Sequence, residues 1–200
     1  MAKMMGPRFK KCRSLGLNVV GHPKAMSRAE KEKGASNSRD SRKLSEYGLQ
    51  LLEKQRLRAY YGVLEKQFVR YVNKAFRKST NPGPILLVSL ETRLDNMVYR
   101  MGFANSLRQA RQLVNHGHFL VNGNKVDRPS YAVQVEDVIT LKEKSQSIKM
   151  IAENLATIVT PLPYLEVQPE QFKGILTRQP LREELPIEIS EQLIVEFYSR

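Results

Sequence analysis

The chain has 200 residues, of which 33 are lysine or arginine and 20 are aspartate or glutamate, so its formal net charge is +13. Hydrophobic residues make up 41% of the chain, which is enough for a packed core and argues against wholesale disorder. The longest apolar stretch, residues 85–90, is far shorter than the roughly 20 residues that span a bilayer, so we expect no integral membrane protein.

The positive charge lies in the first half of the chain. Residues 1–90 carry a net charge of +14, residues 91–154 carry +2 and residues 155–200 carry −3. A charge of this size on a short chain favours a polyanionic partner, most commonly nucleic acid. The single cysteine, Cys12, cannot form an internal disulfide, and the first residues lack the apolar core of a secretory signal, so we expect a reducing compartment.

Residues 1–44 are basic, contain several glycines and prolines, and show little apolar periodicity. They predict an extended arm that becomes ordered on its ligand, with Lys10, Lys11 and Arg13 as contacts. The alternative is a solvated tail in which these side chains do little.

Residues 45–78 predict two helices separated by Gly62, because apolar residues recur at helical spacing and cations occupy the other faces. Tyr60, Tyr61 and Tyr71 could stack on bases, but packing into a core is the favoured interpretation. The sequence STNPGP at 79–84 is a break, and the apolar spacing after it predicts one helix from Leu86 to Met101.

Residues 105–131 contain the most informative pattern. Asn105 or Ser106 can cap a helix with an apolar stripe, and a row of polar donors lies on the neighbouring stripe. Gly117 can end that helix in the left-handed conformation, and Asn122-Gly123 is a strong hairpin signal after a strand at 118–121. Further strands are expected at 125–126 and 137–141, then a helix at 145–155 and an acidic, structural tail.

Catalytic and metal-binding motifs are not evident in the sequence. His116 and His118 could suggest a metal site, but a zinc site needs four ligands, and Cys12 and His22 lie in the distant arm. The triplet Arg93-Leu94-Asp95 is similar to the catalytic aspartate motif of pseudouridine synthases. The chain leaves no room for their large sheet domain, so we favour a structural ion pair between Arg93 and Asp95 and predict no enzyme, metal or cofactor.

Residues 93–131, RLDNMVYRMGFANSLRQARQLVNHGHFLVNGNKVDRPSY, resemble the RNA-binding S-four domain in its ribosomal form. Residues 43–68, 191–200 and 5–16 resemble the parts that flank this domain in the bacterial and plastid family of small-subunit ribosomal protein S-four. The resemblance implies an α+β fold. It consists of an extended basic arm at 1–44, a mostly helical domain at 45–90 plus 156–200, and at 91–155 an inserted S-four domain of helices and a short antiparallel sheet.

The resemblance also implies a function. Family members are structural constituents of the small ribosomal subunit. They bind the five-helix junction in the 5′ domain of its RNA, nucleate assembly and contribute to translational accuracy. Their implied partners are the neighbouring ribosomal protein S-five and messenger RNA where it enters the subunit. The implied location is the cytoplasmic ribosome, with the plastid stroma as the alternative.

Some relatives hold zinc with a cluster of cysteines in the arm, whereas this shortened arm keeps only Cys12, so we expect a zinc-free form. Whether it is the main copy or a zinc-independent second copy stays open. Two other functions also stay open: an accessory RNA-binding factor of the heat-shock or ribosome-rescue type, and, less favoured, an RNA-modifying enzyme.

The predicted RNA contacts combine the cations of the arm and the helical segment with polar residues of the S-four domain. They are Lys10, Lys11, Arg13, Arg39, Arg42, Lys43, Lys54, Arg56, Arg58, Arg70, Arg93, Arg100, Ser106, Arg108, Arg111, Gln112, Asn115, His116, His118, Asn122 and Lys125.

Overall fold

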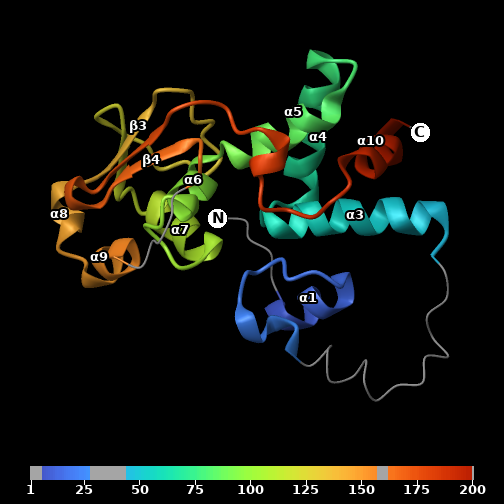
Figure 1. Ribbon diagram of the computed structural model, residues 1–200, viewed down its shortest axis with the longest axis horizontal. Helices are drawn as coiled ribbons and strands as arrows, with labels where there is room; N and C mark the ends of the chain where they lie inside the picture. The colour runs from blue at the N-terminus through green and yellow to red at the C-terminus, as the bar shows by residue number, and fades with distance from the viewer. Residues whose placement is uncertain (1–5, 28–43, 157–161, 200) are drawn as a thin grey trace. The chain divides into compact units, whose positions relative to one another are not determined.

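The computed structural model describes residues 6–27, 44–156 and 162–199. The chain forms two compact units, whose helices and strands are shown in Figure 1. The first unit contains the residues up to Leu86 together with those from Ile187 onward, and the second contains Leu87–Pro186. Within the described ranges, no helix is both long and apolar enough to cross a membrane.

The first unit is helical, and its last helix returns to its first half. Ser45 caps α3, because its Oγ accepts a hydrogen bond from the backbone N–H of Gly48 at 3.2 Å. Gln50 of α3 donates to Glu196 of α10 at 3.0 Å, although the two residues are 146 positions apart. The elements of this unit are α1 (Arg8–Leu15), the 3₁₀ turn η1 (Pro23–Ala25), α3 (Glu46–Tyr60), α4 (Glu65–Lys78), the start of α5 (Pro82–Glu91) and α10 (Glu191–Ser199).

The described part of the arm is folded, which differs from the extended arm that the sequence predicted. Helix α1 ends at Gly16 in the left-handed conformation, with φ +62°. Cys12 and Ala25 are fully buried and pack in one cluster with Ala59 of α3. Residues 6–27 therefore fold by burying the few apolar residues of the arm against α3, whereas residues 28–43 lie outside the described residues.

The second unit combines helices with a five-stranded antiparallel sheet in the order β2-β1-β3-β5-β4. Fully buried Met97, Phe103, Phe119, Ile139 and Tyr164 belong to its core. Its elements are α6 (Leu94–Arg100), α7 (Leu107–Asn115), β1 (Phe119–Val121), β2 (Asn124–Lys125), β3 (Val138–Leu141), α8 (Glu143–Gln146), α9 (Lys149–Ala156), β4 (Leu165–Gln168), η2 (Pro169–Gln171), β5 (Lys173–Leu176) and η3 (Arg182–Glu184). The predicted α+β class, with a helical first part and a small antiparallel sheet, is confirmed.

The tail differs from the sequence-based assignment. Strand β5 pairs with β3, with Val138 opposite Ile175, and β4 pairs with β5, so residues 165–176 belong to the sheet. The assignment of the whole 156–200 segment to the helical domain is therefore wrong for these strands. Only the residues from Ile187 onward lie in the first unit.

Two predicted helices are each interrupted. The helix expected from Leu86 to Met101 breaks after Glu91, where the Asn96 side chain donates to the Glu91 carbonyl at 2.8 Å. The backbone N–H of Leu94 donates instead to the carbonyl of Tyr131 at 2.9 Å. The helix expected at 145–155 is divided into α8 and α9. Tertiary hydrogen bonds thus replace the local helical bonds at the first break.

Candidate nucleic-acid interface

Helix α7 presents the predicted row of donors. Ser106 caps it, since its Oγ accepts from the backbone N–H of Gln109 at 3.3 Å. The apolar stripe is buried through Ala110, Leu113 and Val114. The predicted row was Arg108, Arg111, Gln112 and Asn115. Arg108, Gln112 and Asn115 are exposed, as is His116 beside them, whereas the Arg111 side chain is only 11% exposed.

A further cation, Lys125, lies beside the C-terminal end of α7. Gly117 has φ +72°, and its N–H donates to Val114 while that of His118 donates to Leu113, the two bonds of a Schellman motif. Lys125 of β2 lies against this glycine, because a Cβ added to Gly117 would be 2.5 Å from Lys125 Cε. We call the exposed residues Arg108, Gln112, Asn115, His116 and Lys125 the α7 face.

His118 is half-buried and differs from His116 in its environment. Its Nδ1 lies 2.9 Å from Ser145 Oγ. Burial lowers the pKa of His118, and the nearby charges of His116 and Lys142 lower it further. These effects favour the neutral, hydrogen-bonding form of His118 over the cation that would pair with phosphate.

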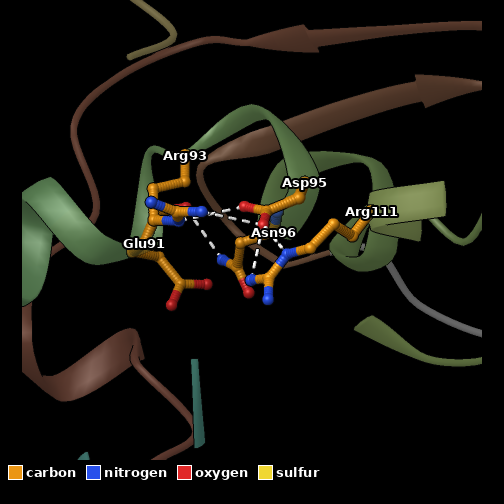
Figure 2. A network of polar contacts seen from close by, with 5 residues as sticks. All are labelled: Glu91, Arg93, Asp95, Asn96 and Arg111. Carbon is orange, nitrogen blue, oxygen red and sulfur yellow. Dashed lines mark hydrogen bonds and ion pairs between the residues drawn. The ribbon is translucent and has the colours of Figure 1, made fainter. Parts of the chain in front are cut away.

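A buried network connects α7 to α6 (Figure 2). The Asp95 side chain is 0% exposed and accepts hydrogen bonds from Arg93 Nε at 3.0 Å and Arg93 Nη2 at 2.9 Å. Arg111 of α7 donates to the same carboxylate through Nε at 2.7 Å. The predicted ion pair between Arg93 and Asp95 is confirmed. With a side chain only 4% exposed, Arg93 is badly placed for the direct RNA contact that we predicted.

Arg100 also has an internal role. Its Nε donates to Oε1 of the buried Glu91 at 2.7 Å, and the hydroxyl of Tyr164 donates to the same oxygen at 2.8 Å. The Arg100 side chain is 10% exposed. This geometry argues against Arg100 as a direct RNA contact.

Asn122 uses its side chain to hold the hairpin. Its Nδ2 donates to Asp137 Oδ1 at 2.7 Å, and its Oδ1 accepts from the backbone N–H of Val138 at 2.9 Å. Asn122 and Gly123 have φ values of +50° and +78°, so the predicted two-residue turn is confirmed. The asparagine shapes the turn before Lys125 instead of offering a free amide.

The predicted cations of α3 are neutralised by carboxylates. Lys54 Nζ lies 2.9 Å from Glu65 Oε1, and Arg58 Nη1 lies 2.7 Å from Glu65 Oε2. Arg56 pairs with Glu53 at 2.6 Å. Burial by itself raises the pKa of Glu65, but hydrogen bonds from Lys54 and Tyr198 and the charges of Lys54 and Arg58 outweigh it, so the pKa is lowered. These α3 cations hold the helical unit together.

The exposed cations of the first unit lie on α4 instead. Phe68, Val72 and Ala75 form its buried face. On its exposed side are Lys66, Arg70, Lys74 and Arg77, which we call the α4 face. No ion pair to these four is found among the described residues. Only Arg70 was among the predicted contacts, although the same helical spacing marks the other three.

The arm contributes one exposed predicted contact, Lys10, whereas Lys11 and Arg13 are half-buried on α1. Burial lowers the pKa of Lys11, and the charge of Arg58 lowers it further. The predicted contacts Arg39, Arg42 and Lys43 lie outside the described residues. Across the described ranges, no group of three or more histidine, cysteine, aspartate or glutamate side chains could hold a metal ion.

Matches to two family models place the chain in the class of S4-domain proteins. Residues 92–139 match the sequence model of the S4 domain, and residues 3–91 match that of the Ribosomal protein S4/S9 N-terminal domain.

Two relatives match from end to end. The chain is 52% identical over 200 residues to Small ribosomal subunit protein uS4B of Clostridium acetobutylicum, and 56% identical over 203 residues to Small ribosomal subunit protein uS4 of Finegoldia magna. Each alignment covers 100% of both chains. The chain therefore belongs to the family of small ribosomal subunit protein uS4.

Proposed function

We propose that this protein is a structural constituent of the small ribosomal subunit and binds its ribosomal RNA. The observation that carries the proposal is the full-length identity of 52% and 56% with two bacterial proteins named as small ribosomal subunit proteins. The plastid alternative gains no support from these bacterial relatives, and the ribosome of a bacterial cytoplasm is the proposed location.

The α7 face supplies directional contacts. Arg108 and Lys125 can neutralise phosphates, while Gln112 and Asn115 can donate to phosphate or 2′-hydroxyl oxygens. The helix cap at Ser106 and the hairpin at Asn122 hold these groups on regular elements of one unit. Such a surface recognises the shape of a folded RNA more than its base sequence.

The α4 face supplies charge. Lys66, Arg70 and Lys74 follow one another four residues apart, and steps of four residues place them about 6 Å apart along the helix axis. Because their chemistry is electrostatic, they add affinity that depends strongly on salt and little on sequence.

The finer assignments are proposals from the family resemblance. They are binding to the five-helix junction of the 5′ domain, an early role in assembly, a contact with ribosomal protein S-five, and a position where messenger RNA enters the subunit. A protein that binds only the folded junction stabilises that RNA conformation by the difference in its affinity for the two states. This is a structural and not an enzymatic role.

A titration of the purified protein tests the proposal. We expect saturable one-to-one binding to the 5′ domain of small-subunit RNA. An unrelated RNA duplex should bind about 10³-fold or more weakly at the same salt concentration, as is usual for specific nucleic-acid complexes. Equal affinity for both RNAs would contradict specific recognition of the 5′ domain. Formation of pseudouridine in the bound RNA would instead support the enzyme alternative.

A further inference from the structure

We propose that Asp95, a buried acidic residue, is a positioning residue for RNA binding and acts through Arg111 on α7. The inference rests on the proposed function, because it concerns how the α7 face is held in its binding orientation. Asp95 has no surface of its own to offer, since its side chain is 0% exposed.

The hydrogen bonds of Asp95 leave its carboxylate fully occupied. Oδ1 accepts from Arg93 Nε and from the backbone N–H of Asn96, both at 3.0 Å. Oδ2 accepts from Arg93 Nη2 at 2.9 Å and from Arg111 Nε at 2.7 Å. In Figure 2 the Arg111 side chain extends from α7 to this carboxylate at the start of α6. Arg111 thereby fixes α7 to the first turn of α6.

Arg111 lies next to the residues that point outward. It is three residues after Arg108, one before Gln112 and four before Asn115, so a rotation of α7 that moved Arg111 would move these donors as well. Directional hydrogen bonds to RNA need donors within a narrow range of orientation. The buried carboxylate therefore sets the geometry of the exposed row.

The charge balance makes the role testable. The Asp95 carboxylate forms ion pairs with two guanidinium groups, and the Arg93 and Arg111 side chains are only 4% and 11% exposed. Without the negative charge the two cations would repel each other in a site with little water. Arg111 is the more exposed of the two, so it is the side chain that would leave.

In the variant Asp95→Asn, the change in net charge and the loss of positioning are expected to change the affinity for RNA in opposite directions. The substitution raises the net charge of the protein by one, which by itself strengthens binding to any polyanion. Loss of positioning instead weakens binding to the folded 5′-domain RNA and leaves binding to an unrelated duplex unchanged or tighter. Asp127→Asn, at an exposed residue of the same unit, is the matched control for charge.

We expect Asp95→Asn to weaken binding to the 5′-domain RNA about 10- to 100-fold relative to Asp127→Asn, as for the loss of one or two hydrogen bonds to a charged group. The double variant Asp95→Asn with Arg111→Gln should bind no more weakly than Arg111→Gln alone, because both changes break the same connection. A merely structural defect would lower the fraction of active protein, which the stoichiometry of the titration reports separately.

Arg111→Lys is the second test, because it keeps the charge but loses the guanidinium geometry. If the thermal melt of Asp95→Asn shows that this variant does not fold, Arg111→Lys alone tests the positioning role. We expect weaker binding to the 5′-domain RNA with the binding to duplex unchanged. Wild-type-like affinity in Arg111→Lys, or in a folded Asp95→Asn, would overturn the positioning role. Failure of the wild type to distinguish the two RNAs would overturn the proposed function instead.

Discussion

Replacing Arg70 and Lys74 by glutamine tests whether the α4 face contacts RNA. Both side chains are exposed, they lie four residues apart, and the buried face of α4 is formed by other residues. The double variant therefore removes two positive charges without removing packing. The cations of α3 would not serve this purpose, because Lys54 and Arg58 are ion-paired with Glu65.

The expected size of the effect follows from counterion release. Each lost phosphate contact reduces the slope of log affinity against log salt by about 0.7 to 0.9, so two contacts reduce it by about 1.4 to 1.8. Between about 50 and 200 mM salt, the difference in affinity between wild type and variant should then narrow about 7- to 12-fold. The variant is weakest relative to wild type at low salt.

A filter-binding titration at several salt concentrations measures this slope. The control variant, Lys144→Gln with Lys149→Gln, removes the same charge from exposed residues of α8 and α9. We expect the control to keep the wild-type slope. If the control changes the slope as much as the α4 variant does, net charge and not contact at α4 explains the affinity, and the reasoning fails.

Three other predictions concern the α7 face and the helical unit. Arg108→Ala with Gln112→Ala should weaken binding to the 5′-domain RNA without changing the thermal melt, because both residues are exposed. Unchanged affinity would show that these α7 residues do not contact the RNA. Gly117→Ala places a side chain at φ +72° and against Lys125, so it should cost about 1–2 kcal/mol and lower the Tm by several degrees. A wild-type Tm would contradict this. Because folding lowers the pKa of Glu65 from 4.5, ionised Glu65 stabilises the folded state at pH values above 4.5. This contribution is lost as the pH falls through the lowered pKa. Chemical denaturation from pH 6 to 3 should therefore show a smaller dependence on pH in Glu65→Gln, and an equal dependence would refute it.

Local rules predicted the local features of the candidate site. Ser106 caps α7, Gly117 ends it, and Asn122 with Gly123 turns the hairpin, as the sequence indicated. Each of these features depends on residues only a few positions apart, so its physical cause can be identified in the sequence. The exposed row on α7 follows from helical periodicity for the same reason.

Local sequence patterns could not predict which cations form ion pairs within the protein. The partner of Lys54 is eleven residues away, and Arg111 reaches Asp95 across sixteen. Composition shows that a segment is basic, but only the folded structure shows which cations are neutralised internally. The sequence therefore named Lys54, Arg56 and Arg58 without indicating that carboxylates pair with them, and it named only one residue of the α4 face.

The strands of the tail were missed for a related reason. Strand β5 is four residues long and pairs with β3, more than thirty residues earlier in the chain. Its burial alternates, with Gly174 and Leu176 buried, but so short a pattern does not say which domain the strand joins. Long-range pairing, and not local propensity, places residues 165–176 in the sheet.

Sedimentation of ribosomes tests the central claim most directly. Extracts of cells that contain the protein are separated on a sucrose gradient, and the small subunits are then washed at high salt and separated again. A structural constituent should stay with the small subunits at one copy per particle through the wash. Release of the protein into the light fractions would contradict the account and indicate a transient RNA-binding factor.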